Sequence, residues 1–420
     1  MERFVGLIGV IVILGICFLM SNNKKAISKK TVLTGLALQI FLAVFILKVP
    51  LGQAIVGAIG KFINKILEFA NSGGNFVFGF LNDSPQKVQE LFGGGPIFAV
   101  QLTITIILVL ALANILYYYG IMQRIIAFFA KIMHKIMNVS GAESISNIAS
   151  AFVGQVEAQI LIRPYLASLT KSELLASMTG SMACIAGGVM AIYISMGVPA
   201  EFLLAASIMA APGALVVSKI VYPETEQSQT KDNVSVEIKK THINLIDAIA
   251  HGASDGMRVS INVIAMLIAL LALVAMIDWV LGGIGSFMVH KLHWSLSFFD
   301  LEQLDLKNIL GFVFSAFALI MGVPLGEVQA VGSLMGTKMV LNEFIAYMQL
   351  TSASLSPKAT IIASFALCGF ANLGSIAIQI GGIGELEASK RKDLAKFGFK
   401  ALICGTFASY ISACIAGMLL

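Results

Sequence analysis

The sequence predicts an all-α membrane protein with eight transmembrane helices and two oppositely oriented re-entrant hairpins in an inverted repeat, plus interfacial amphipathic helices. Three observations predict this fold. Hydrophobic residues make up 58% of the 420 residues and charged residues only 12%, with a mean hydropathy of +0.89, whereas soluble domains carry about 25% charged residues. Apolar stretches of transmembrane length recur along the chain. Two irregular apolar stretches, one in each half, contain an acidic motif, and charge at membrane depth is costly unless it has a function.

Stretches of about 20 apolar residues predict the helices that cross the bilayer. The first is followed rather than preceded by a basic cluster, so we expect a retained helix and not a secretory signal. The eight predicted spans lie near residues 4–20, 32–48, 97–118, 174–196, 202–219, 257–282, 358–383 and 397–419.

The two irregular stretches, 142–170 and 308–350, have glycines, prolines and acids in mid-stretch, and we expect each to form a re-entrant hairpin. Basic residues are enriched on the cytoplasmic side of a membrane. The lysines at 24–30 and the basic stretch 390–392 therefore place both termini outside. The first hairpin then enters from the cytoplasm and the second from outside, and each is followed by two helices. Such an inverted repeat is typical of secondary transporters.

Two further stretches, Leu51–Phe69 and Ile121–Val139, alternate apolar and basic residues at helical spacing. They predict amphipathic helices at the membrane interface, and the alternative is that each packs on the protein without touching lipid. The polar stretch from Tyr222 to Thr241 predicts an exposed cytoplasmic loop.

The predicted organisation has five parts. They are scaffold and interfacial helices at 1–140, the first hairpin and broken-helix repeat of a transport domain at 141–220, a cytoplasmic loop and connecting helix at 221–256, a scaffold helix and external loop at 257–307, and the second hairpin and broken-helix repeat of the transport domain at 308–420.

Two of the predicted spans should break near their middle. One contains Gly187 and Gly188, and the other contains the polar stretch 369–375. Paired glycines weaken a helix by roughly 1 kcal/mol each, and an unwound stretch at membrane depth is tolerated where it lines protein or a cavity. Each break follows its acid, Glu157 or Glu343, by about 30 residues. The matched spacing supports the repeat, although close helix packing alone would also explain the glycines.

The predicted site is polar and largely neutral. It combines Gln155 and Glu157 of the first acidic motif with Glu343, Asn372 and Ser375 of the second half. Two carboxylates with amides and a hydroxyl suit a neutral ligand that is rich in hydroxyls and ring nitrogens. No cluster of arginines is present for a phosphate.

Structural roles remain as alternatives for these groups. Glu157 can pair with Arg163 and only fix its hairpin, and Glu343 can pair with Lys338. Asn372 and Ser375 can instead form hydrogen bonds between helices.

Other classes of protein fit less well. The five histidines lie outside the predicted spans or at their edges, which disfavours an intramembrane enzyme, and the five cysteines show no CxxC pair, which predicts neither disulfides nor a metal site. No P-loop is present, so ATP drive is not expected. A channel is the remaining rival, but two opposed hairpins around broken helices fit alternating access better. Neither a cofactor nor a nucleic-acid partner is predicted.

Several motifs from about residue 140 to the C-terminus resemble those of the concentrative nucleoside transporter family. The signature Gly-x-Lys-x-x-x-Asn-Glu-Phe-x-Ala-Tyr is complete. The matching segments are Gly154–Glu157, Leu161–Tyr165, Ala211–Ala214, Ser218–Lys219, Pro223–Glu226, Gly336–Tyr347, Ala366–Asn372 and Ala413–Gly417.

The resemblance implies a homotrimer in the cell (cytoplasmic) membrane, with a scaffold and a moving transport domain in each protomer. In the family, Gln155 and Glu157 would face the nucleobase, and Glu343, Asn372 and Ser375 would hold the ribose hydroxyls. The substrate-binding residues implied are Gln155, Val156, Glu157, Val189, Glu343, Phe370, Asn372 and Ser375.

Two departures from the family concern the coupling ion. Sodium-coupled members carry an Asn and a Ser where this chain has Ser150 and Cys184, and a hard cation prefers oxygen ligands to a thiol. The main-chain carbonyls of Val153 and Ile185 could remain as ligands. A desolvated carboxylate, Glu157 or Glu343, would then carry a proton. We therefore expect a nucleoside:proton symporter, with a sodium symporter as the alternative.

Two further departures concern the base. Val156 and Gly188 stand where many members carry hydroxyls, which favour pyrimidines. An apolar wall suits the larger face of a purine, because a pyrimidine's polar edge would lose a partner there. We expect a preference for purine nucleosides, with pyrimidine or broad specificity as the alternative.

Overall fold

The computed structural model describes residues 4–82, 97–231, 242–294 and 301–419. Within these ranges the regular structure is helical and no strand is present, so the all-α prediction is confirmed for the described residues. Part of the predicted cytoplasmic loop, 232–241, and part of the predicted external loop, 295–300, lie outside them.

The N-terminal part is a series of helices that ends before the first acidic motif. Both predicted amphipathic stretches are helical, and the first is longer than expected because Pro50 starts it and no break follows before Gly79. The helices are α1 (Val5–Leu19), α2 (Lys29–Leu47), α3 (Pro50–Phe78), α5 (Phe98–Tyr118) and α6 (Ile121–Met137), with short 3₁₀ turns η2 (Lys24–Ala26) and η3 (Gly79–Asn82).

The first acidic motif lies between short helices. The Ser140 side chain caps α7 by accepting a hydrogen bond from Glu143 N. Thr170 and Glu173 form a capping box at the start of α9. The elements are α7 (Gly141–Ser150), α8 (Glu157–Ile160), η4 (Arg163–Ser168), α9 (Lys171–Ala183), α10 (Gly187–Ser195) and α11 (Ala200–Val221).

The second half begins with one very long helix and then repeats the order of the first. Ser356 caps α16 and Pro357 occupies its first turn. The elements are α12 (Leu245–His290), η5 (Leu301–Gln303), α13 (Leu306–Ile320), η6 (Leu325–Glu327), α14 (Val328–Val340), α15 (Glu343–Ser352), α16 (Pro357–Leu367), α17 (Leu373–Leu386), η7 (Ala388–Lys390) and α18 (Arg391–Leu419).

The two halves share one pattern in sequence. In each, an acid lies between short helices, a broken helix follows, and a long unbroken helix ends the unit. The first break separates α9 from α10 at residues 184–186, and the second separates α16 from α17 at residues 368–372. Both predicted spans are therefore broken, although the first break lies just before Gly187 and Gly188, which are the first residues of α10.

The structure differs from the predicted spans in three places. The stretch 308–350 contains three helices, because Gly322 in the left-handed region (φ +88°) and Pro324 end α13 before α14 begins. α12 begins at Leu245 rather than near 257. Among the described residues, six helical segments are long and apolar enough to cross a membrane, with α9 and α10 counted together as Lys171–Ser195. The predicted spans 4–20 and 358–383 are not among them, because α1 has 15 residues and the second is divided into α16 and α17.

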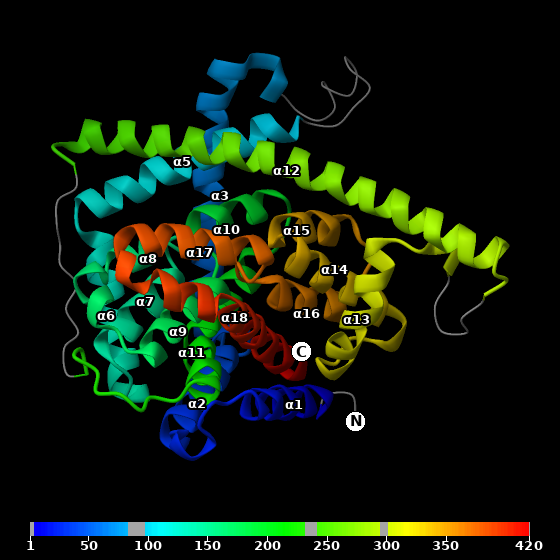
Figure 1. Cartoon of the computed structure of the whole chain (residues 1–420). Coiled ribbons are helices and arrows are strands. Elements are labelled where there is room, and N and C mark those ends of the chain that lie inside the picture. The colour runs from blue at the N-terminus through cyan, green and yellow to red at the C-terminus, as the bar shows by residue number, and fades with distance from the viewer. Residues whose placement is uncertain (1–3, 83–96, 232–241, 295–300, 420) are drawn as a thin grey trace.

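α18 lies at the centre of the molecule and contacts α1, α9, α11, α16 and α17. α12 crosses one side of the molecule, and α5 lies along it (Figure 1). The two helices approach closely at Gly252 and Gly256, where a Cβ would lie 2.6 Å from the Cα atoms of Ala111 and Ile107. The glycines thus allow α5 and α12 to pack backbone to backbone.

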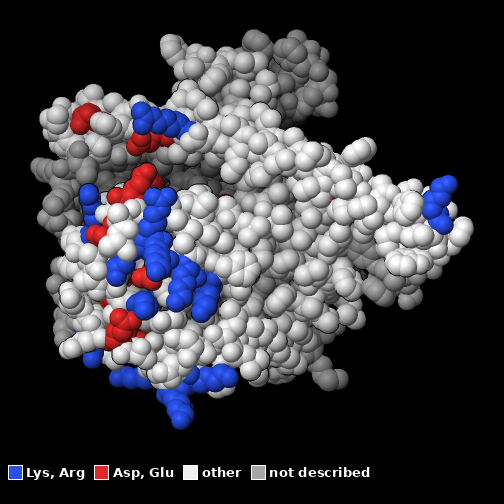
Figure 2. All heavy atoms as spheres, in the orientation of Figure 1, with Lys and Arg blue, Asp and Glu red and all other residues white. Residues whose placement is uncertain are grey.

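The surface agrees with a membrane environment. Figure 2 shows a broad area without charged groups, with most charged side chains of this face gathered toward the left. Large apolar side chains point outward from α12, including Ile268 (67% exposed) and Trp279 (80% exposed). A surface of this kind is expected where lipid replaces water.

Candidate functional site

The two helix breaks meet inside the molecule. Gly369, in the second break, has φ +116°, and a Cβ there would lie 2.5 Å from the carbonyl oxygen of Ala183, the last residue of α9. Glycine is required for this approach because any side chain would strain both the backbone angle and the contact. The ends of α9 and α16 and the starts of α10 and α17 are thereby brought together from two distant parts of the sequence.

Glu343 lies at the start of α15 and is 5% exposed. Its Oε1 accepts a hydrogen bond from the Tyr193 hydroxyl of α10 (2.9 Å), and its Oε2 accepts one from Asn372 Nδ2 (3.0 Å). The Asn342 side chain caps the same helix by accepting from Ile345 N (2.9 Å). A carboxylate in the first turn of a helix is favoured by the helix dipole. The carboxylate is thus held by two donors and keeps lone pairs for a ligand.

Asn372 links Glu343 to the start of α17. Its Oδ1 accepts a hydrogen bond from Ser375 N (2.9 Å), so the residue caps the helix while its amide donates to Glu343. The Ser375 hydroxyl accepts from Gln155 Nε2 (3.0 Å). Gln155, from the first acidic motif, therefore reaches the second-half cluster as the sequence predicts. Its Oε1 is buried and has no hydrogen-bond partner, which leaves an acceptor for a ligand.

Glu157 takes a different position from Glu343. It is exposed, and its carboxylate folds back over the turn, where a Cβ on Gly154 would lie 2.1 Å from its Oε2. Glycine at 154 gives this carboxylate room. No ion pair joins Glu157 to Arg163 in the described part of the chain, so the structural alternative for Glu157 is not realised. Among the described residues, no hydrogen bond joins Glu157 to the Glu343 cluster either.

The coupling-ion candidates lie beside each other. Phe152 O accepts a hydrogen bond from Gly187 N (3.0 Å), which ties the turn containing Val153 to the break containing Cys184 and Ile185. Ser150 Oγ donates to Ser146 O (2.7 Å) and lies 3.2 Å from Ser181 Oγ. These four candidates and Glu343 are buried, whereas Glu157, the other carboxylate candidate, is exposed.

The Ser150 hydroxyl and the Cys184 thiol already have partners inside the protein. Cys184 Sγ lies 3.8 Å from Ser207 O, and a hydroxyl that donates to a carbonyl can still accept. Ser181 Oγ has one proton, which it can donate either to Ser150 Oγ or to Gln155 O, each at 3.2 Å. One hydrogen-bond chain thus joins the coupling candidates to the predicted substrate residues. Its members are Ser150, Ser181, Gln155, Ser375, Asn372 and Glu343.

The remaining predicted residues lie on the segments that carry Gln155, Tyr193 and Asn372. Val189 and Phe370 are half-buried. Val156 contacts α17, where a Cβ on Gly382 would lie 2.4 Å from its Cγ2. Gly188 faces α5, and a Cβ there would meet Leu110 and Val109 at 3.5 and 3.6 Å.

Sequence reasoning missed Tyr193. This residue lies in the predicted span 174–196, is fully buried, and stacks with Tyr347 at a ring-centroid distance of 4.6 Å. A buried tyrosine hydroxyl needs a hydrogen-bond partner, so a tyrosine within an apolar span is a signal that could have found it.

The structure also assigns Lys338 a role that differs from the predicted alternative. Its Nζ donates to the carbonyls of Ala366 (3.0 Å) and Cys368 (3.3 Å) at the end of α16. A lysine that satisfies the free carbonyls of a helix end is favourable. Lys338 therefore holds the second helix break and forms no ion pair within 4.0 Å with Glu343 in the described structure.

Family models match most of the chain. The models described as "Na+ dependent nucleoside transporter N-terminus", "Nucleoside recognition" and "Na+ dependent nucleoside transporter C-terminus" match residues 8–81, 99–200 and 202–417.

Whole-chain relatives agree with these models. An "Uncharacterized transporter" of Haemophilus influenzae is 42% identical, with 98% of this chain and 96% of that protein covered. The "Nucleoside permease NupC" of Helicobacter pylori is 37% identical, with the same shares covered. The solved structure of CNTnw in an inward-facing substrate-bound state has a TM-score of 0.91 and 40% identity, and the match covers 100% of this chain and 98% of that one.

Proposed function

We propose that this chain, which belongs to the Na+ dependent nucleoside transporter family, is a secondary active importer that carries purine nucleosides together with protons. Membership makes it a multi-pass membrane transporter of nucleosides rather than an enzyme. The direction of transport, the ion and the base preference are our proposals. The observation that carries them is the buried Glu343 carboxylate, held by Tyr193 and Asn372 where the two halves of the chain meet.

Glu343, Asn372 and Ser375 would bind the ribose. A buried carboxylate with free lone pairs is a strong acceptor for two neighbouring hydroxyls, and the amide and hydroxyl beside it supply further polar contacts. This assignment is supported by the hydrogen bonds that fix all three side chains before any ligand is present. Preorganised groups lose little entropy when the ligand binds.

Gln155 would bind the base. Its buried Oε1 has no partner in the protein, and an unsatisfied buried acceptor costs about 1–3 kcal/mol. A base N–H would remove this cost. Glu157, Val156, Val189 and Phe370 would complete the base side. Neither Val156 nor Gly188 presents a hydroxyl, which supports the purine preference.

Protons would drive transport. Sodium prefers several oxygen ligands, and here the side chains at the two coupling positions are one hydroxyl and one thiol. The Ser150 hydroxyl already donates to Ser146 O, and the Cys184 thiol lies within hydrogen-bond distance of Ser207 O. The carbonyls of Val153 and Ile185 alone would be a weak sodium site. A proton carried by Glu343 or Glu157 needs no such cage.

Transport would follow alternating access of the elevator kind. The moving body would comprise residues 141–220 and 308–420, and residues 1–140 and 257–307 would form a static scaffold, with 221–256 connecting them. We further propose a homotrimer in the cytoplasmic membrane with both termini outside. The acid, broken helix and long helix that recur in both halves support one body built from two repeats.

Uptake of labelled adenosine into proteoliposomes tests the coupling, with sodium and proton gradients imposed separately. We expect an inward proton gradient to drive accumulation, a protonophore to abolish it, and replacement of sodium by choline at constant pH to leave it unchanged. Loss of uptake in choline would refute proton coupling and favour sodium. If neither gradient drove uptake and the protein bound no nucleoside, the proposed nucleoside site itself would be refuted.

Competition tests the base preference. Unlabelled inosine should reduce adenosine uptake at lower concentration than unlabelled uridine. The reverse order would contradict the purine proposal. Val156→Thr restores a hydroxyl at the first departure and should shift the order toward uridine.

A further inference from the structure

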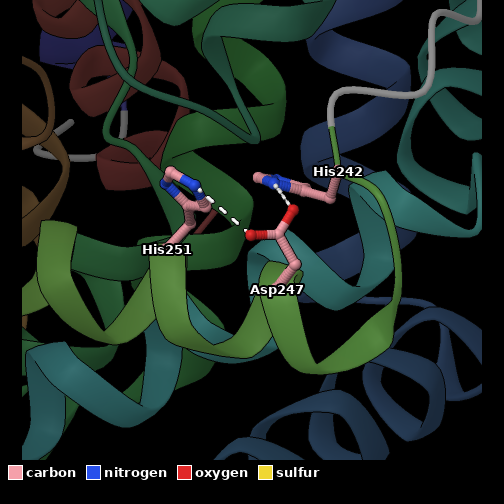
Figure 3. Close-up of side chains that lie close together, drawn as sticks. All are labelled: His242, Asp247 and His251. Carbon is pink, nitrogen blue, oxygen red and sulfur yellow. Dashed lines mark ion pairs between the residues drawn. The ribbon is translucent and has the colours of Figure 1, made fainter.

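Three potential metal ligands lie together at the start of α12, and none of them belongs to the proposed nucleoside site. Figure 3 shows His242, Asp247 and His251, with both imidazoles directed toward the carboxylate. His251 Nε2 lies 3.5 Å from Asp247 Oδ1, and His242 Nδ1 lies 3.9 Å from Asp247 Oδ2. One ligand atom of each residue lies within 4.8 Å of the others.

The local fold explains why they meet. Asn244 caps α12 by accepting a hydrogen bond from Asp247 N (2.9 Å), and Asp247 Oδ2 accepts one from Ile243 N (2.9 Å). These two hydrogen bonds hold the residues before α12 against its first turn, and His242 therefore lies next to Asp247. His251 follows Asp247 by one helical turn, so both lie on the same face.

The tautomer of His242 can be derived from its neighbours. Asn114 Nδ2, on α5, donates to Leu110 O (3.0 Å), so the other amide atom, Oδ1, is an acceptor. This Oδ1 lies 3.0 Å from His242 Nε2, which must therefore carry the proton. In the neutral ring Nδ1 then has a lone pair. Nδ1 is buried and has no hydrogen-bond partner.

An unpartnered lone pair that faces a carboxylate is unfavourable, and a cation between them would remove the conflict. We propose that His242 Nδ1, one oxygen of Asp247 and His251 Nε2 bind a divalent transition metal ion, for which Zn²⁺ is the best fit. Two imidazoles and a carboxylate suit Zn²⁺, and imidazole disfavours Mg²⁺ and Ca²⁺.

Binding of an ion requires the three side chains to close around it. Zinc–ligand distances of about 2.0–2.1 Å place neighbouring ligands of a tetrahedron about 3.3 Å apart. The separation of 3.5 Å runs from His251 to Oδ1 of Asp247 and that of 3.9 Å from His242 to Oδ2, and all three ligand atoms lie within 4.8 Å of one another. Rotation of the carboxylate and of both imidazoles would bring them to these distances. The His251 side chain is 62% exposed, so the fourth position faces solvent and can hold water.

The hydrogen bond from His242 to Asn114 is the kind of outer contact that metal-bound histidines make. It connects the ion to α5, next to the place where Gly252 of α12 packs against Ala111. The ion would therefore fasten the start of α12 to its own first turns and to α5. This role is structural, and it does not depend on the proposed nucleoside site.

Zinc titration calorimetry on the full-length protein tests the site. The protein is purified in detergent through an affinity tag without histidine, stripped with a chelator and dialysed. We expect one saturable Zn²⁺ per chain, and a Co²⁺-loaded sample should show the visible absorption of a tetrahedral site. His251→Gln should weaken binding at least tenfold, and the exposed position of His251 makes this change harmless to packing. Asp247→Asn should act in the same direction.

Two further variants separate a built site from adventitious binding. Asn114→Leu removes only the outer hydrogen bond and should weaken Zn²⁺ binding about 10- to 100-fold. His290→Gln removes an exposed histidine at the other end of the same helix and should change nothing. Zn²⁺ should also raise the thermal midpoint of the wild type but not of His251→Gln.

The proposal fails if the wild type shows no saturable Zn²⁺ binding near neutral pH, which would mean that a second proton on His242 satisfies the cluster. It also fails if the His251→Gln, Asp247→Asn double variant binds as tightly as the wild type, or if His290→Gln weakens binding as much as His251→Gln. These outcomes leave nucleoside uptake untouched, so they are distinguishable from failure of the proposed function.

Discussion

Glu343→Gln tests the central assignment by replacing one carboxylate oxygen with an amide nitrogen. The wild-type carboxylate accepts from Tyr193 and from Asn372. Glutamine can keep both contacts if its oxygen accepts from Asn372 and its amide donates to the Tyr193 hydroxyl, which can also accept. The fold should therefore survive, and the loss should fall on the ligand.

The magnitude follows from the bonds at stake. Hydrogen bonds to charged groups contribute about 1.5–3 kcal/mol and neutral ones about 0.5–1.5 kcal/mol. Two ribose hydroxyls that each lose about 1–1.5 kcal/mol give a total of about 2–3 kcal/mol. At 1.4 kcal/mol per tenfold, this is about a 30- to 150-fold loss in the transport equivalent of kcat/KM.

Initial rates of adenosine uptake into proteoliposomes measure this loss, with equal amounts of inserted protein. Glu385→Gln is the matched control, because Glu385 is exposed on α17 and makes the same charge change away from the cluster. Free adenine, which lacks ribose, should compete poorly in the wild type. Uptake by Glu343→Gln within threefold of the control would refute the ribose assignment. A large drop in its thermal midpoint would instead assign Glu343 to the fold.

Three other variants have defined expectations. Ser181→Ala removes the hydroxyl that lies between the two candidate clusters. Nucleoside binding, measured by equilibrium titration, should then depend less on pH. An unchanged pH dependence would contradict the coupling. In the wild type the Lys219 ammonium lies 2.6 Å from the buried Glu143 carboxylate, and Lys219→Met removes this partner. The free energy of unfolding, measured from denaturation curves, should fall by about 3–5 kcal/mol. Adding Glu143→Gln should recover much of this loss. Gly369→Ala places a methyl against Ala183 O, and the strain of about 1–3 kcal/mol should lower the thermal midpoint; an unchanged midpoint would show that the breaks can separate.

The sequence was sufficient to predict the helix breaks. Gly187–Gly188 and the stretch 369–375 stand within apolar spans, and the breaks lie at or beside them. Contacts with distant residues accompany both breaks, from Gly187 N to Phe152 O and from Gly369 to Ala183. The number of membrane-spanning helices is a different kind of question. Apolar length does not distinguish a helix that crosses the bilayer from one that packs inside the protein, and so the stretch 308–350 could not be divided into α13, α14 and α15 before the turn at Gly322 was seen.

Gln155, Glu343, Asn372 and Ser375 could be grouped from sequence because each is a polar residue in an apolar context. The groups to which these residues hydrogen-bond could not be predicted from the sequence. Whether Glu343 pairs with Lys338 or with Tyr193 depends on how α10 and α16 cross, which no spacing along the chain reveals.

The link between the two candidate clusters is a consequence of where the helix breaks cross. Because Gly369 lies against Ala183, residues from the first half reach side chains that cap a helix of the second half. Gln155 is the member that spans the gap, since its side chain contacts Ser375 while its carbonyl accepts from Ser181. A change of charge near Ser150 therefore reaches Ser375 through only two intermediate residues, all of them buried. In a low-dielectric interior neighbouring hydrogen-bonding groups polarise one another, so the proposed ion and nucleoside sites would be coupled through adjacent residues rather than through a distant conformational change.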